Sequence, residues 1–232
     1  MPKHSKRFNE LSSKVDPTQR FGLAEAIALA KSLANAKFDE SLEIAVDLNV
    51  NPAKGEENVR GTIVLPHGTG KTIRVAVFAE GDAAQAALAA GADRVGTDDL
   101  VEAITGGWND FDVLVAQPQL MRIIGPLGKM LGPRMPSKKA GNVLVEVDKA
   151  VEQLKAGRIE YRVDRTGVIH CPIGKVSFTD AQLLENLQAL IAAVQAARPA
   201  TVAGRYITGA ALCTTMGPGL QLDLDAVRAK AA

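Results

Sequence analysis

The period of the hydrophobic residues changes twice along the chain, and no other feature limits the possible fold as much. From Leu42 to Leu48 every second residue is a large aliphatic one, which predicts a strand with one face in water. Residues 73–78 (IRVAVF) and 112–116 (DVLVA) are instead almost continuously apolar, as in strands that are covered on both faces. The sequence therefore predicts two different kinds of sheet.

The open kind of sheet is expected from both ends of the chain. Residues 59–65 predict a second strand, residues 158–178 two or three short strands, and residues 204–217 a strand that runs into a Gly-Pro-Gly turn. Two helices are expected beside them, at 21–36 and at 180–197, because both segments are rich in Ala and Leu. The second helix carries one apolar stripe, which consists of Leu183, Leu184, Leu187, Leu190, Ile191 and Val194.

The middle of the chain alternates apolar strands with helices. Helices are expected at 82–91 and 148–157, with Asp82 and Asp148 as their N-caps and Gly91 as the end of the first. Alternation of buried strands with helices favours a small parallel sheet. Together with the open sheet from the chain ends, this pattern predicts an α/β fold of two domains.

The simplest arrangement is one domain interrupted by another. Residues 1–67 and 158–232 are predicted to form a discontinuous α+β domain, and residues 68–157 an inserted Rossmann-like α/β domain. The chain then crosses between the domains twice. The crossings are expected to form a hinge, with Pro66, Gly68 and Gly70 on one strand and Gly157 on the return strand.

The first crossing carries the sequence GTGKT, which looks like the end of a phosphate-binding loop. Such a loop requires a first glycine five positions before Gly70, where this chain has Leu65, and a helix after the lysine. The residues that follow Lys71 are typical of a strand instead. A nucleotide-binding enzyme that uses GTGKT is therefore the second hypothesis for the function, behind a binding role.

Other catalytic and metal-binding patterns are weak, so we expect no enzyme, no metal and no cofactor. His4, His67 and His170 lack metal-ligand spacing, and His170 and Cys171 would point to opposite faces of a strand. Cys171 and Cys213 make no disulfide framework and are expected to be structural. Without a secretory signal or an apolar run of membrane-spanning length, a cytoplasmic protein without a membrane partner is expected.

The charge distribution is more informative than the net charge of +1. No acidic residue lies between Asp112 and Glu146 or between Glu185 and Asp223. Such windows are compatible with binding a polyanion, and equally with ordinary solvated side chains. The cations concerned are Arg122, Lys129, Arg134, Lys138 and Lys139 in the first window, Arg198 and Arg205 in the second, and Lys3, His4, Lys6 and Arg7 at the start of the chain.

Four segments point together to one family: AKFDESLEIAVDLNV (36–50), NVRGTIVLPHGTGK (58–71), AGRIEYRVDRTGVIHCPIGKVSF (156–178) and TTMGPGLQLD (214–223). With the opening PKHSKR, they resemble the bacterial L-one ribosomal proteins over nearly the whole chain. The resemblance implies a two-domain protein with the main rRNA-binding surface on the domain made from both chain ends. It also implies a Rossmann-like insert on a two-stranded hinge.

The resemblance further implies the function. Members of this family are structural components of the large ribosomal subunit, where they bind large-subunit rRNA and form the mobile stalk beside the tRNA exit site. They aid the release of deacylated exit-site tRNA and commonly repress their own operon by binding its mRNA. A ribosome-bound protein that forms no homo-oligomer is therefore expected.

Several residues within the matching segments suit the recognition of structured RNA, which depends on phosphates, 2′-hydroxyls and base planes. Phe38 beside Lys37 would combine stacking with a phosphate contact, although an aromatic residue before a strand is alternatively a core residue. The segment 214–217 offers hydroxyls, a polarisable thioether and a bare backbone, or is alternatively a plain strand end. The expected RNA-binding residues are Lys37, Phe38, Arg165, His170, Lys175, Thr214, Thr215, Met216 and Gly217.

One segment departs from the family pattern. Residues 131–143 (LGPRMPSKKAGNV) are two residues shorter than usual and have Ser137 where Asn is usual, so no site residue is transferred there. A general RNA chaperone, which would bind many RNAs with similar affinity, is the third hypothesis.

Overall fold

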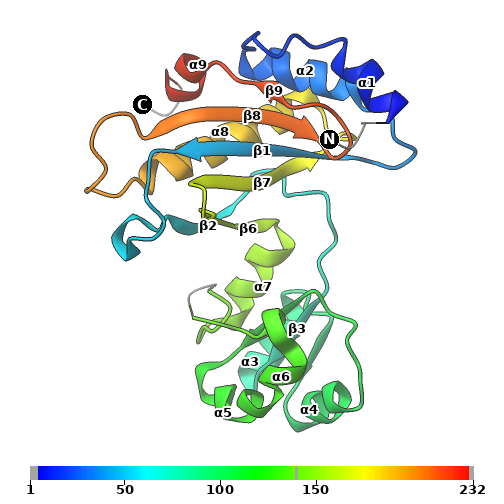
Figure 1. Cartoon of the computed structure of the whole chain (residues 1–232). Coiled ribbons are helices and arrows are strands. Elements are labelled where there is room, and N and C mark those ends of the chain that lie inside the picture. Colours follow the sequence, from blue (N-terminus) through cyan, green and yellow to red (C-terminus); the bar gives the residue numbers. More distant parts are fainter. Residues whose placement is uncertain (1–4, 139–140, 230–232) are drawn as a thin grey trace. The chain divides into compact units, whose positions relative to one another are not determined.

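The structure is a computed structural model that describes residues 5–138 and 141–229. Lys3, His4 and Lys139, which the charge distribution included, lie outside these residues. The helices and strands are labelled in Figure 1. Within the described ranges, no helix is both long and apolar enough to cross a membrane.

The contacts divide the chain into two compact units. Unit 1 comprises Met1–Gly70 and Ile159–Ala232, and unit 2 comprises Lys71–Arg158. The chain passes between the units after Gly70 and after Arg158, whereas the sequence placed these crossings after residues 67 and 157. Both units combine helices with a sheet, so the predicted α/β class is confirmed.

Unit 1 is built on a four-stranded sheet with the order β7-β1-β8-β9, in which all neighbouring strands are antiparallel. A separate pair of strands, β2 and β6, forms a two-stranded sheet. The elements are α1 (Lys6–Ser12), α2 (Leu23–Leu33), β1 (Ser41–Leu48), the 3-10 helix η1 (Gly55–Glu57), β2 (Arg60–Val64), β6 (Arg158–Arg162, which starts at the boundary), β7 (Val168–Lys175), α8 (Asp180–Ala196), β8 (Ile207–Thr214), β9 (Leu220–Gln221) and α9 (Leu224–Ala229).

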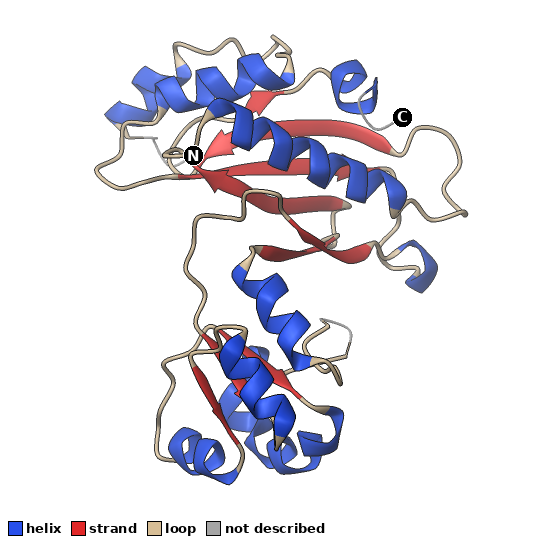
Figure 2. Ribbon diagram, turned by 180° about the vertical axis from the view of Figure 1, so that it is seen from behind, coloured by secondary structure: helices blue, strands red, loops and turns tan. Residues whose placement is uncertain are grey.

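The alternation predicted for β1 is confirmed. Its aliphatic residues are buried beneath α2 and α8, while Glu43 and Asp47 are exposed on the opposite face. Figure 2 shows α8 along the back of this sheet. The helix starts with a capping box, because the Thr179 hydroxyl accepts from the Gln182 N–H and the Gln182 side chain accepts from the Thr179 N–H. The sheet therefore keeps one face open, as the sequence predicted.

Unit 2 is built on a three-stranded parallel sheet with the order β4-β3-β5. Successive residues of β3 alternate between two separate cores: Val75 and Val77 pack in one, and Ala76 and Phe78 in the other. The elements are β3 (Val75–Phe78), α3 (Asp82–Ala89), β4 (Arg94–Gly96), α4 (Asp98–Thr105), β5 (Val113–Ala116), η2 (Pro118–Leu120), α5 (Met121–Ile124), η3 (Gly125–Leu127), α6 (Gly128–Leu131), η4 (Gly132–Arg134) and α7 (Val147–Lys155).

The two predicted aspartate N-caps of unit 2 are wrong. Gly81 caps α3 and Glu146 caps α7, without a side-chain hydrogen bond in either case. Asp82 and Asp148 lie within the first helical turn instead, where a carboxylate still interacts favourably with the helix dipole. The predicted end of α3 holds, since Gly91 follows the last turn with a φ of 94°.

Candidate nucleic-acid interface

Two large apolar side chains of unit 1 are exposed at the same end of the open sheet. Phe38 is 56% exposed and Met216 is 45% exposed, so the core position considered for Phe38 is excluded. Lys37 beside Phe38 and Thr215 beside Met216 are exposed as well. We refer to these four residues, Lys37, Phe38, Thr215 and Met216, as the platform.

The platform joins two distant segments through one buried side chain, Glu40, which is 2% exposed. Its Oε1 accepts a hydrogen bond from the Ala36 N–H at 3.0 Å, and its Oε2 accepts one from the Met216 N–H at 3.0 Å. Burial raises the pKa of Glu40, but these two bonds, the Thr214 side chain and the charge of Arg7 together lower it below its usual value. The carboxylate is therefore ionised and holds the segments 36–40 and 214–217 together.

Thr215 closes the end of the sheet. Its N–H donates to the Ser41 carbonyl at 3.0 Å, and its Oγ1 accepts from the Ser41 N–H at 2.9 Å. The hydroxyl also lies 3.2 Å from the Ser41 carbonyl, to which it donates. The Thr215 side chain is exposed, as the predicted contact with ribose requires. Its hydroxyl is already bonded to the Ser41 backbone, so ribose would compete with these bonds at the end of the strand.

Thr214 does not lie on the surface as expected. Its side chain is 3% exposed, because Thr214 shares the alternation of the buried residues Ala210 and Leu212 in β8. Gly217 is packed against it, since a Cβ on Gly217 would lie 2.4 Å from the Thr214 Oγ1. A glycine at 217 therefore leaves room for the Thr214 side chain, and the buried Thr214 hydroxyl is removed from the candidate contacts.

His170 and Lys175 lie on β7, beside β1. His170 is paired with Ala45 and Lys175 with Ser41, so Lys175 is at the platform end and His170 is five residues away along β7. His170 is exposed and Cys171 is buried, as the alternation of a strand predicts. Lys175 Nζ lies 3.9 Å from Asp39 Oδ2, which places this cation near the backbone of Phe38.

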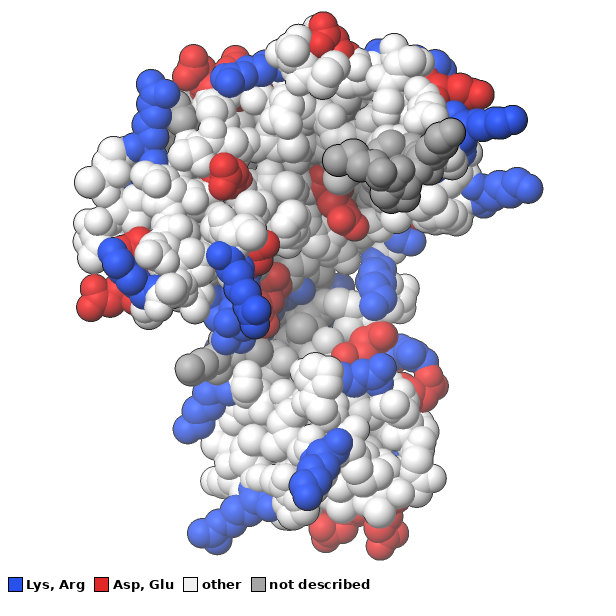
Figure 3. All heavy atoms as spheres, in the orientation of Figure 1, with Lys and Arg blue, Asp and Glu red and all other residues white. Residues whose placement is uncertain are grey.

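The open face between these residues carries two carboxylates and is otherwise largely uncharged. Figure 3 shows it as largely uncharged, with isolated acidic side chains and with Lys and Arg at its margins. The acidic residues are Glu43 and Asp47, and small residues such as Ala45 and Ala211 lie between them. A polyanion would therefore find its cations at the ends of the strands rather than over the middle of the sheet.

Arg165 lies at the opposite end of the sheet from the platform. It belongs to the turn that precedes β7, whose first residue pairs with Asp47. An eight-residue strand such as β1 spans about 23 Å, so Arg165 and Phe38 would contact different parts of a ligand. Asp164 holds the turn: hydrogen bonds from the Thr166 hydroxyl and the Val168 N–H lower its pKa.

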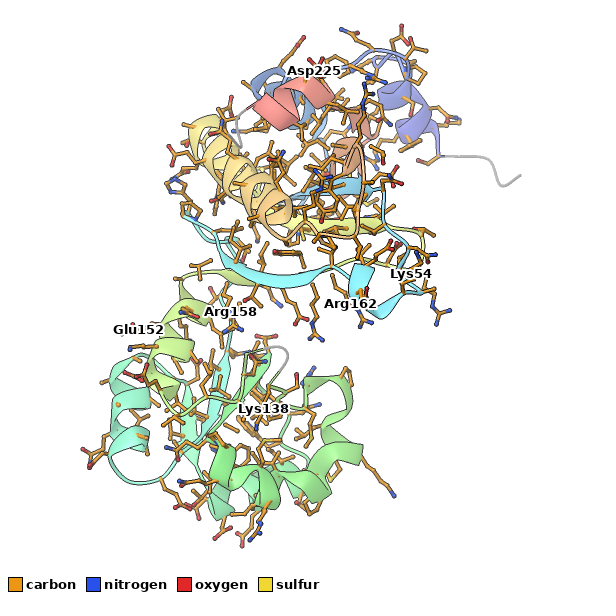
Figure 4. The ribbon with its side chains drawn as sticks, turned by 90° about the vertical axis from the view of Figure 1, so that its left-hand side faces the viewer. Lys54, Lys138, Glu152, Arg158, Arg162 and Asp225 are labelled. Carbon is orange, nitrogen blue, oxygen red and sulfur yellow. The ribbon has the colours of Figure 1, made fainter. Side chains whose placement is uncertain are left out.

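A second arginine accompanies Arg165. A hollow of about 480 Å³ is lined there by Pro52, Asn58, Arg162, Val163, Asp164 and Arg165. Figure 4 shows Arg162 and Lys54 at this edge of unit 1. Arg162 was missed by the sequence interpretation, although it lies on the same face of β6 as the exposed Glu160 and alternates with the buried Tyr161.

The residues expected in the hinge are not in strands. Residues 65–74 have no regular structure apart from turns, because Gly68 and Gly70 adopt φ values of 65° and 73° that a strand does not accommodate. Gly157 follows the last turn of α7 with a φ of 92°, the conformation of a helix-terminating glycine. The strand conformation predicted for these positions is therefore wrong.

A buried asparagine fastens the first of these segments to unit 1. Asn186 of α8 is fully buried; its Oδ1 accepts from the His67 N–H at 3.0 Å, and its Nδ2 donates to the Gly68 carbonyl at 2.9 Å. The same Nδ2 donates to the Ile173 carbonyl at 2.9 Å. The polar residue within the apolar stripe of α8 was the signal that could have revealed this role.

The sequence GTGKT does not form a phosphate-binding loop. The residues after Lys71 lead into the strand β3 without an intervening helix. The Lys71 ammonium lies 3.6 Å from Asp112 Oδ1.

The two cysteines are unpaired, and burial raises the pKa of Cys171 to about 12. In the described part of the chain, no group of His, Cys, Asp and Glu is arranged to hold a metal ion.

Comparisons with known proteins agree over almost the entire chain. A sequence model of the Ribosomal protein L1p/L10e family matches residues 29–218. The chain is 52% identical over 225 residues to the large ribosomal subunit protein uL1 of Lactobacillus acidophilus, covering 96% of this chain and 98% of the relative. Proteins of the same name from Alkalilimnicola ehrlichii and Deinococcus radiodurans are 53% and 52% identical, covering 97% of this chain and 98% and 97% of the relatives.

The class defined by these matches is that of ribosomal proteins, whose role is structural and not enzymatic. Within that class, the chain belongs to the Ribosomal protein L1p/L10e family. The family resemblance carried by the four sequence segments is thereby confirmed, and the hypothesis of a nucleotide-binding enzyme is rejected.

Proposed function

We propose that this protein is a constituent of the large ribosomal subunit that binds large-subunit rRNA directly through unit 1. The observation that carries the proposal is the platform: Phe38 and Met216 are exposed by 56% and 45% on two segments that hydrogen bonds hold together. Exposed apolar side chains in such a rigid setting are typical of binding surfaces. Relatives that are about half identical over their full length bear the name large ribosomal subunit protein uL1.

The platform offers a chemical route to a folded RNA. The Phe38 ring presents a face on which a base or ribose can stack, and the thioether of Met216 adds a polarisable contact. Lys37 and Lys175 supply ammonium groups for the flanking phosphates. The weakly charged face of the sheet disfavours contact along a continuous phosphate chain, so the favoured ligand is a compact RNA fold that presents sugars and bases to the platform.

Three finer roles complete the proposal and rest on the family resemblance. The protein forms the mobile stalk beside the tRNA exit site, and it aids the release of deacylated tRNA from that site. It also represses its own operon by binding a segment of the mRNA on the same surface as the rRNA. All three place the protein on cytoplasmic ribosomes without a cofactor and without a second copy of itself.

The platform is tested by truncating Phe38. Phe38→Ala should weaken binding to a stalk rRNA fragment by roughly 5- to 150-fold, the range for loss of one aromatic stacking partner. Filter-binding titrations at fixed moderate salt measure the affinity, with a scrambled RNA as the specificity control. Leu88→Ala is the matched control, because Leu88 is also 56% exposed but belongs to unit 2.

An unchanged affinity of Phe38→Ala for the stalk fragment would show that the platform is not the rRNA contact.

The hypothesis of a general RNA chaperone makes a separate prediction, namely that unrelated RNA competes as well as the stalk fragment. Autogenous repression requires that an RNA fragment from the leader of the operon compete for the platform and be weakened by the same substitution.

A further inference from the structure

Arg7 lies at the junction of three parts of the chain. From α1 its Nη1 donates to the Asn35 Oδ1 at 2.7 Å, and its Nη2 donates to the Met216 carbonyl at 3.0 Å. The residues joined by the second bond are 209 positions apart. Arg7 thus bridges the two platform segments from outside, while Glu40 joins them from beneath.

Glu40 and Arg7 act on the two peptide units that flank Met216. The Met216 N–H donates to Glu40 and its carbonyl accepts from Arg7. A residue whose N–H and C=O are both bonded to charged side chains is fixed in position more firmly than one that ends a strand without such partners. The direction in which the Met216 side chain projects therefore depends on both charges.

The side of the platform that carries Phe38 depends on Glu40 as well. The carboxylate accepts from the Ala36 N–H, two residues before Phe38, and the Glu40 carbonyl accepts from the Val176 N–H. The loop between α2 and β1 is thereby fixed at both ends. The main core of unit 1 consists of apolar side chains, most of them from the sheet and from α2 and α8.

We propose that Glu40 and Arg7 are positioning residues of the RNA-binding platform, which orient Phe38 and Met216 without contacting the RNA themselves. This inference rests on the proposed function of the platform. It assigns a part in RNA recognition to the N-terminal helix α1, which contributes through Arg7 only. Loss of either residue leaves the platform side chains present but no longer held in one arrangement.

The first test is Glu40→Gln, which keeps the size of the side chain. The amide can accept from only one of the two N–H groups, because its NH₂ faces the other. The amide proton of either Ala36 or Met216 should then exchange with solvent faster in NMR hydrogen-exchange measurements. Affinity for the stalk rRNA fragment should fall about tenfold or more. Glu25→Gln on α2 removes the same charge from an exposed position and should leave the affinity unchanged.

A double-mutant cycle separates positioning from general stability. In a Phe38→Ala/Met216→Ala background, Glu40→Gln should have little further effect on the affinity, since the side chains that it positions are absent. The slope of affinity against salt concentration should be the same for Glu40→Gln and the wild type, because no phosphate contact is lost. Arg7→Met should weaken the binding in the same way, while Arg7→Lys should retain part of it.

Two results would overturn the inference. One is faster exchange at Met216 or Ala36 in Glu40→Gln with undiminished RNA affinity, which would make the bonds irrelevant to recognition. The other is an equal loss of affinity in the wild-type and the Phe38→Ala/Met216→Ala backgrounds, which would mean that Glu40 acts elsewhere. Failure of the platform itself is distinguished by Phe38→Ala, which would then leave the affinity unchanged.

Discussion

The sequence predicts the roles of some single residues in unit 1 and not of others. Alternate residues of a strand lie on the same face. This predicts that Thr214 lies with Leu212 on the buried face and that Glu40 lies on the same side as Leu42. The sequence interpretation chose Thr214 for its hydroxyl group and overlooked that the alternation of the strand places this side chain in the core. The exposure of Phe38 was expected from the family resemblance and not from a local period, because residues 34–40 form no helix or strand.

Asn186 provides the clearest test at this scale. Asn186→Ala leaves the His67 N–H and the carbonyls of Gly68 and Ile173 without their partner. The bond to Ile173 is buried and the other two are part-buried. Since an unsatisfied buried group costs about 1–3 kcal/mol, the free energy of unfolding of unit 1 should fall by about that amount. The tyrosines Tyr161 and Tyr206, both buried in unit 1, report its unfolding in urea.

The matched control for Asn186→Ala is Gln188→Ala, two residues further along α8, which should change the stability by less than about 0.5 kcal/mol. The urea concentration at the midpoint of unfolding of unit 2, followed through its single tryptophan Trp108, should be unchanged in both variants. A stability loss of equal size in the two substitutions would mean that the hydrogen bonds of Asn186 contribute nothing specific.

Elements were predicted well where one period governs a long segment and less well where a boundary depends on tertiary contacts. β1 and α8 follow their periods closely. The N-caps of α3 and α7 were misplaced by one and two residues, because the residues that cap these helices form no side-chain hydrogen bond. The coil at 65–74 could not be separated from a strand because its conformation depends on a bond from α8.

In unit 2, Asp93 joins elements that are distant in sequence. Its Oδ2 accepts from the Val75 N–H of β3 at 2.7 Å and from Lys155 of α7 at 2.6 Å. Burial raises the pKa of Asp93, but the bonds from Lys155 and Val75 lower it overall. A lowered pKa in the folded state means that the carboxylate stabilises unit 2 above its ordinary pKa of 3.8 and that this contribution is lost as the pH falls through the folded value.

Asp93→Asn should therefore destabilise unit 2 at pH 7, and its difference from the wild type should shrink as the pH is lowered below about 4. Urea titrations followed by Trp108 fluorescence at several pH values measure this difference. Asp82→Asn, at an exposed position in the first turn of α3, is the control and should show a smaller effect. A difference that is the same at pH 7 and pH 3 would contradict the assignment.

At the scale of the whole molecule, the core of unit 1 shares no residue with either of the two cores of unit 2. β2 and β6 pair in unit 1, so the two strands that precede and follow the insert lie side by side. A chain in which residues 71–158 are replaced by a short Gly/Ser linker should fold and keep its affinity for the stalk rRNA fragment within about threefold. Circular dichroism and the filter-binding titration check the two halves of this prediction. Loss of folding would show that unit 1 depends on the insert, and folding without RNA binding would assign part of the contact to unit 2.

The bond between Arg7 and Met216 also has a consequence for the synthesis of the protein. A ribosome synthesises the chain at about 5–20 residues per second and releases it from the N-terminus onward. Arg7 and Glu40 emerge early, but Met216 emerges only when almost all of the polypeptide has been made. The proposed platform is therefore complete only after the ribosome has made nearly the whole chain, since its two segments come from opposite ends of the sequence.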